Sequence, residues 1–127
     1  MEYVFLLSRV LFGGFWIWSG IAHFRQGKMM VPYTASKGVP LPQAAVYGSG
    51  ALIILGGLGI LLGVQVPLAV LALVVFIVPV SFTMHAFWSD TDPTMKMTNT
   101  VMFSKNIALL GASLAYLFIA TPWPLSL

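Results

Sequence analysis

The chain has 127 residues, of which 59% are hydrophobic and only 7% are charged. Soluble globular proteins carry about 25% charged residues, so this composition excludes a water-soluble domain. The net charge is only +3, which does not suggest a nucleic-acid partner, and the lack of cysteine excludes disulfides, thiolate chemistry and cysteine-ligated metal centres. We therefore expect a single domain, residues 1–127, embedded in a lipid bilayer.

Four apolar stretches predict four membrane-spanning helices, at about residues 3–24, 44–64, 67–87 and 93–121. Each stretch is close to or above the roughly 20 residues that a helix needs to cross a hydrocarbon core of about 30 Å. Only a few residues separate the second and third stretches, so these two helices are expected to be antiparallel neighbours. The predicted fold class is an all-α membrane protein, a four-transmembrane-helix antiparallel bundle whose first and third helices lie on a diagonal.

Polar and small residues share one face of the first predicted helix. Arg9, Trp16, Gly20 and His23 are separated by seven, four and three residues, which keeps them on one helical stripe. This stripe should face other helices and not lipid. Glu2 lies two helical turns before Arg9 and is its candidate ion-pair partner, but a role of Arg9 in a site is an equally open interpretation.

The segment between the first two membrane helices, residues 25–43, is rich in proline and glycine. This density excludes a continuous helix and predicts a loop that lies on the interface or folds back over the bundle. In the next helix, Gly59 and Gly63 form a G-x-x-x-G pair, which is typical of close helix packing in lipid.

The third and fourth predicted helices carry the remaining polar signals. Ser81, His85 and Trp88 are expected to line one face of the third helix. Asp92 followed by Pro93 is typical of a helix N-cap and first helical position. Trp123, beyond the end of the fourth helix, is the expected interfacial anchor.

The distribution of lysine and arginine predicts the orientation. All basic loop residues fall in residues 25–43 and 89–99, whereas the opposite side carries none. By the positive-inside rule, these two loops should be cytoplasmic and both chain termini external.

This topology brings the two histidines, His23 and His85, to similar depth near one membrane surface, with Trp88, Lys105 and Asn106 nearby. Ionisable groups within a membrane usually face the bundle interior and mark a function, although a lysine near the surface can extend to water. A quinone head group fits this set, since it needs donors to its carbonyls, aromatic walls and access from lipid. A bis-histidine haem b is the alternative cofactor. No metal-ligand spacing and no nucleophile–base pair is present, so neither a metal site nor catalytic residues are predicted.

The same residues resemble the DoxX family of small four-helix bacterial membrane proteins. The resemblance rests on Arg9 and Gly13, Ser19-Gly20 before His23, Lys37-Gly38-Val39-Pro40, His85-Ala86-Phe87-Trp88, and Lys105-Asn106 before Leu110-Gly111. The positions that match the family pattern are Arg9, Gly20, His23, Pro40, His85, Trp88, Lys105 and Asn106. The family is named after a subunit of a thiosulfate:quinone oxidoreductase, so the resemblance implies a bacterial inner-membrane location and quinone-linked redox chemistry.

Two functions of different class follow as hypotheses. The first is a membrane subunit of a quinone-linked oxidoreductase that binds a quinone through His23, His85, Trp88, Lys105, Asn106 and Arg9. The second is a non-catalytic anchor or assembly subunit for a soluble redox partner. Both predict a protein partner or a homo-oligomer, and whether the chain is itself an enzyme stays open. Transport is less attractive, because four helices leave little room for a pathway within one protomer.

Overall fold

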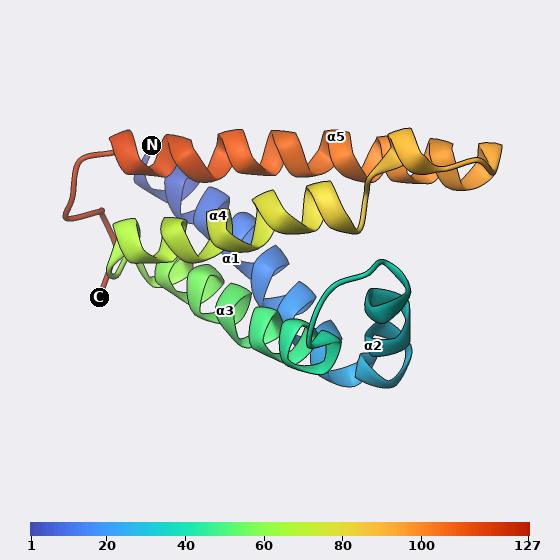
Figure 1. Cartoon of the computed structure of the whole chain (residues 1–127). Coiled ribbons are helices and arrows are strands. Elements are labelled where there is room, and N and C mark those ends of the chain that lie inside the picture. Colours follow the sequence, from blue (N-terminus) through green and yellow to red (C-terminus); the bar gives the residue numbers. More distant parts are fainter.

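The computed structural model describes all 127 residues, and every regular element in it is helical (Figure 1). The elements are α1 (Glu2–Arg25), α2 (Gly27–Ser36), α3 (Pro42–Leu62), α4 (Val66–Thr83), the 3-10 turn η1 (Phe87–Ser89), α5 (Pro93–Ala115) and the 3-10 turn η2 (Tyr116–Phe118). Four helices are long and apolar enough to cross a membrane: α1, α3, α4 with its extension through η1, and α5 with η2. The predicted all-α fold with four membrane-spanning helices is confirmed.

The central element is α3, which packs against α1, α2 and α4, while α5 packs against α4 (Figure 1). The backbones of the first and third membrane helices, α1 and α4, do not approach each other closely, as expected for a diagonal pair; the two helices meet through side chains such as Trp16 and Phe76. Both chain ends lie at one end of the bundle, and α2 and the start of α5 lie at the other (Figure 1).

Glycines let α1 and α3 approach closely. A Cβ atom added at Gly13 would lie 2.6 Å from the backbone oxygen of Gly57, and one at Gly20 would lie 2.6 Å from that of Gly50. The buried residues of α1 are Arg9, Gly13, Trp16, Gly20 and His23, which confirms the predicted stripe. Close backbone approach allows extensive dispersion contact where lipid provides no hydrophobic driving force between helices.

Of the predicted G-x-x-x-G pair, Gly59 mediates helix packing and Gly63 ends the helix. A Cβ atom at Gly59 would lie 2.5 Å from that of Ala69 on α4, so Gly59 does mediate a helix contact. Gly63 instead ends α3 in the left-handed conformation with φ +72°, and its N–H bonds to the Gly59 carbonyl. A residue with positive φ after a helix is a common helix end that glycine adopts without steric cost.

The prediction of a loop over residues 25–43 was wrong for Gly27–Ser36, which form α2. Pro32 lies inside this helix, where a proline removes one internal hydrogen bond. Contacts with the bundle offset that loss, since α2 packs on α3 and α1, and Gly27 lies against the Tyr47 ring. The break from α1 falls at Gln26, and the fold-back over the bundle is confirmed.

Two predicted helix ends and one anchor need correction. The third membrane helix ends as α4 at Thr83, not at residue 87, so His85 and Trp88 do not share a helix face with Ser81. The last helix ends at Ala115, and the chain then turns through η2. This turn carries Trp123 back into the core, where it is only 2% exposed, so it is not an interfacial anchor.

The predicted N-cap of the last helix is confirmed, because Asp92 Oδ2 accepts a hydrogen bond of 2.9 Å from the Met95 N–H. Replacing Asp92 by alanine should destabilise the start of α5 by about 1 kcal/mol, since one orphan N–H loses its partner. Amide hydrogen exchange at residues 94–96 should accelerate, whereas Asp92→Asn should leave it nearly unchanged. Unchanged exchange in the alanine variant would contradict a capping role.

Candidate functional site

A cavity of about 510 Å³ lies at the α2 end of the bundle, between α2, α3 and α4. Its walls are mostly apolar and include Leu52 of α3, and Phe76 and Val80 of α4. Polar side chains are few, and the two histidines of the chain are among them. The residues with polar side chains in this lining are His23, Tyr33, Thr34, Ser49, Thr83 and His85.

His23 enters the cavity from the end of α1 and is only 9% exposed. Its Nδ1 lies 2.9 Å from the Val46 carbonyl oxygen and 3.0 Å from Ser49 Oγ. A carbonyl oxygen can only accept, so Nδ1 carries the proton of the neutral ring. The second nitrogen, Nε2, is then a hydrogen-bond acceptor, and the Phe76 ring lies edge-on to the imidazole at 5.6 Å.

His85 reaches the same cavity from the turn after α4. Its Nδ1 lies 3.2 Å from Asn99 Oδ1, and the Asn99 amide nitrogen donates to Asp90 Oδ2 at 2.8 Å. The carboxylate of Asp90 accepts, so it orients the Asn99 amide with its oxygen toward the histidine. His85 therefore carries its proton on Nδ1 as well, which leaves Nε2 as an acceptor.

Neither Nε2 atom has a hydrogen-bond partner within the protein. The only fully enclosed side-chain nitrogen or oxygen without a partner is Trp16 Nε1, on the same buried stripe of α1 as His23. The two Nε2 atoms are therefore accessible, and both histidines line the cavity. His23 and His85, which the sequence placed at similar depth, thus line the same cavity.

Sequence reasoning missed Thr34, Ser49 and Asn99. Thr34 belongs to α2, which was taken for a loop; it is 7% exposed, lines the cavity, and its hydroxyl has no partner within the chain. Ser49 lay in a stretch interpreted only as packing. For Asn99 a signal was present, because Asn99, Asn106 and Ser113 recur every seven residues and are the buried residues of α5.

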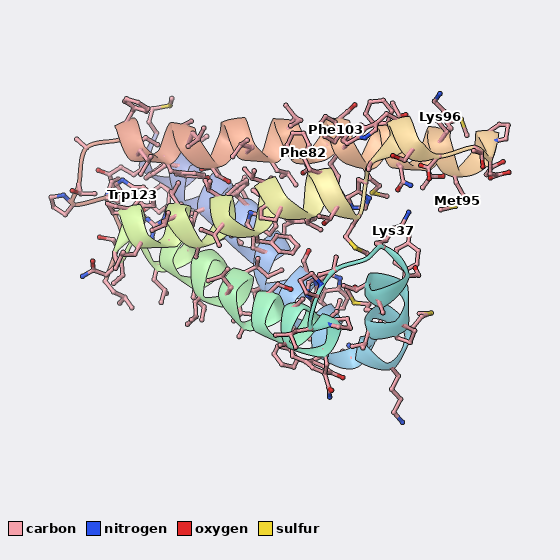
Figure 2. All side chains as sticks on the ribbon, viewed as in Figure 1. Lys37, Phe82, Met95, Lys96, Phe103 and Trp123 are labelled. Carbon is pink, nitrogen blue, oxygen red and sulfur yellow. The ribbon has the colours of Figure 1, made fainter.

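The other four predicted site residues do not line the cavity. Trp88 is 51% exposed and packs in an aromatic cluster with Phe82 and Phe103, which face each other between α4 and α5 (Figure 2). Lys105 is exposed, and its Nζ lies 5.9 Å from the Phe15 ring centre. Asn106 is buried on α5, seven residues after Asn99, and does not line the cavity.

Arg9 lies at the opposite end of the bundle and holds the C-terminal tail. It is fully buried and donates to the carbonyl oxygens of Leu61 at 2.7 Å and of Pro124 at 2.8 Å. Longer bonds reach the Ile60 and Leu125 carbonyls, and the guanidinium lies 5.5 Å from the Trp123 ring centre. The proposed ion pair with Glu2 was wrong, because carbonyl oxygens from α3 and the tail occupy the donors.

The sequence matches one known protein family. A sequence model of the DoxX family matches residues 4–86, more than half of the chain. The chain belongs to the DoxX family. Searches of the curated proteins and of the solved structures found no match.

The region that matches the DoxX family covers α1 to α4 and includes both cavity histidines. It ends at Ala86, so Asp90 and Asn99, the partners that orient His85, lie beyond it. Trp88, Lys105 and Asn106 lie beyond it as well. With its four apolar helices, this DoxX-family protein is a multi-pass membrane protein.

Proposed function

We propose that this DoxX-family protein is an integral membrane subunit of a quinone-linked oxidoreductase, and that the cavity holds the quinone ring. The observation that carries the proposal is the pairing of two histidines with accessible Nε2 atoms in one otherwise apolar cavity. Ligand sites are typically apolar cavities of about 300–1,000 Å³ with a few placed polar groups. The cavity of about 510 Å³ lies within that range.

The position of the cavity supports entry of a lipid-soluble ligand. Val75 of α4 lines the cavity and is 51% exposed, so the cavity is open at this residue. It is the tenth residue of α4 (Val66–Thr83), so it lies roughly 14 Å from the start of that helix at 1.5 Å per residue. An opening at this depth faces the hydrocarbon core, where quinones are dissolved.

We place the protein in a bacterial inner membrane. The charge distribution supports a cytoplasmic location for the end of the bundle that holds α2 and the cavity. Lys37 and Lys96 lie at the end of the bundle opposite Trp123 (Figure 2). Residues 25–43 and 89–99 would then be cytoplasmic and the termini external. The chain has no cysteine for electron transfer, so we assign the electron exchange to a partner protein at the cytoplasmic face.

The test is to purify the protein in mild detergent, record its absorption spectrum and extract bound quinone with solvent. We expect His23→Phe and His85→Phe each to lower the retained ligand, measured as quinol plus quinone, about tenfold, because each removes an Nε2 acceptor to which a quinol hydroxyl group can donate, the equivalent of about 1.4 kcal/mol. Lys105→Met and Trp88→Phe are the matched controls, since neither residue lines the cavity; both should retain quinone.

Three results would contradict the proposal. A haem Soret band lost in both histidine variants would assign the histidines to haem b. Quinone lost in Lys105→Met but kept in the histidine variants would move the ligand away from the cavity. Absence of quinone, together with a soluble redox protein that co-purifies with all variants, would favour the anchor function.

A further inference from the structure

We infer that the cavity binds the dihydroxy, reduced form of its aromatic ligand in preference to the dicarbonyl, oxidised form. In the bound complex, Nε2 of His23 and Nε2 of His85 each accept a hydrogen bond from a hydroxyl group of the ligand. This inference rests on the proposed function for the class of ligand. Its own basis is the tautomer of each histidine, which the surrounding hydrogen bonds determine.

The tautomer of His23 is set by the backbone. The Val46 carbonyl oxygen lies 2.9 Å from Nδ1 and accepts only, and Ser49 Oγ also donates to that carbonyl at 3.0 Å. A proton on Nε2 would leave two lone pairs, those of Nδ1 and of the carbonyl, facing each other in a buried place. Burial of such an unpaired arrangement is strongly unfavourable, so neutral His23 presents an unprotonated Nε2.

The tautomer of His85 is set by two side chains in series. Asp90 accepts from the Asn99 amide nitrogen at 2.8 Å, and Asn99 Oδ1 accepts from His85 Nδ1 at 3.2 Å. Asn99 is only 3% exposed, so water does not compete for these bonds. Asn99 and Asp90 are positioning residues, because they act on the ligand through the ring of His85.

Two acceptors discriminate between the two redox forms of a ligand. A hydroxyl group donates to Nε2, whereas a carbonyl oxygen in the same place would bring two lone pairs together. The hydroxyl groups of Tyr33 and Thr34, which also line the cavity without a partner in the chain, can both donate and accept and therefore bind either form. Each hydrogen bond to a buried acceptor is worth about tenfold in affinity, so two histidines predict at least a tenfold preference for the reduced form.

The experiment measures binding to the full-length protein in lipid nanodiscs under anaerobic conditions. The probes are 1,4-dihydroxynaphthalene, 1,4-naphthoquinone and 1,4-dimethoxynaphthalene, which share one ring system; only the first donates hydrogen bonds. We expect the dihydroxy probe to bind at least tenfold more tightly than either of the others. Asn99→Leu should reduce this preference by releasing His85 to the other tautomer, whereas Asp90→Asn keeps an acceptor for the Asn99 amide nitrogen and should retain the preference.

A second readout does not depend on any ligand. The chain has only two histidines, so nitrogen NMR of protein labelled in histidine resolves four ring nitrogens. We expect the neutral form of each ring to carry its proton on Nδ1, and Asn99→Leu to change the signals of His85 only. A proton on Nε2 in the neutral form of either ring of the unmodified protein would overturn the inference.

The binding outcomes separate this inference from the proposed function. Naphthoquinone that binds as tightly as the dihydroxy probe, with affinity lost in His23→Phe and His85→Phe, would overturn the inference and leave the proposed function standing. Failure of all three probes to bind would overturn both.

Discussion

Replacement of Arg9 by leucine is expected to destabilise the protein by about 3 kcal/mol and to release its C-terminal tail. The Arg9 guanidinium is buried between α3 and the tail, with bonds of 2.7 Å to the Leu61 carbonyl and 2.8 Å to the Pro124 carbonyl. Hydrogen bonds to charged groups contribute about 1.5–3 kcal/mol each, and leucine would leave both carbonyl oxygens without this donor. The lower desolvation cost of leucine offsets part of the loss.

Thermal unfolding in detergent and digestion by a carboxypeptidase measure these two effects. The stability of Arg9→Lys and the resistance of its tail to digestion should lie between those of Arg9→Leu and of the unmodified protein. The reason is that one ammonium group cannot bridge both carbonyls as the planar guanidinium does. Ser8→Ala is the matched control: the Ser8 hydroxyl donates to Phe5 within the same helix, and its loss should change little. A tail that stays resistant to digestion in Arg9→Leu would contradict the role of Arg9 as the tail's anchor.

Gly13→Val is expected to destabilise the bundle by about 3 kcal/mol, because it forces α1 away from α3. The new Cβ atom would lie 2.6 Å from the Gly57 backbone oxygen, and backbone cannot move aside as a flexible side chain would. Substitutions that overpack a core typically destabilise a protein by about 1–3 kcal/mol and occasionally by more. The clash at residue 13 is with backbone, so we expect a destabilisation at the upper end of this range. His23 lies on the same helix, so the variant should also retain less ligand in the cavity.

The neighbouring residue provides the control for this prediction. A Cβ atom at Gly14 would meet nothing within 4 Å, so Gly14→Val makes the same chemical change without the clash. We expect its unfolding temperature and its yield of monodisperse protein to match those of the unmodified chain. If Gly13→Val and Gly14→Val were equally stable, close approach of the two backbones at Gly57 would be refuted.

Several features of the fold follow from local sequence. The lengths of the four apolar stretches determined the number of membrane helices, since a helix of fixed rise must cross a core of fixed thickness. The spacing of Arg9, Trp16, Gly20 and His23 determined the buried face of α1. Chain topology then placed His23 and His85 at one end, because each follows an odd-numbered crossing. The N-cap at Asp92 is local in the same way.

Only the tertiary structure decided what these polar residues contact. Arg9 binds carbonyl oxygens more than 50 residues away, and His23 takes its tautomer from the backbone of Val46 on another helix. Backbone carbonyls are present at every position, so sequence cannot indicate which of them a side chain will meet. For the same reason the sequence did not mark Thr34 as a cavity residue, and the seven-residue spacing that marks Asn99 as buried does not indicate its bond to His85. The helix pattern determines the bundle, whereas the hydrogen bonds of its cavity depend on which chain segments the packing brings together.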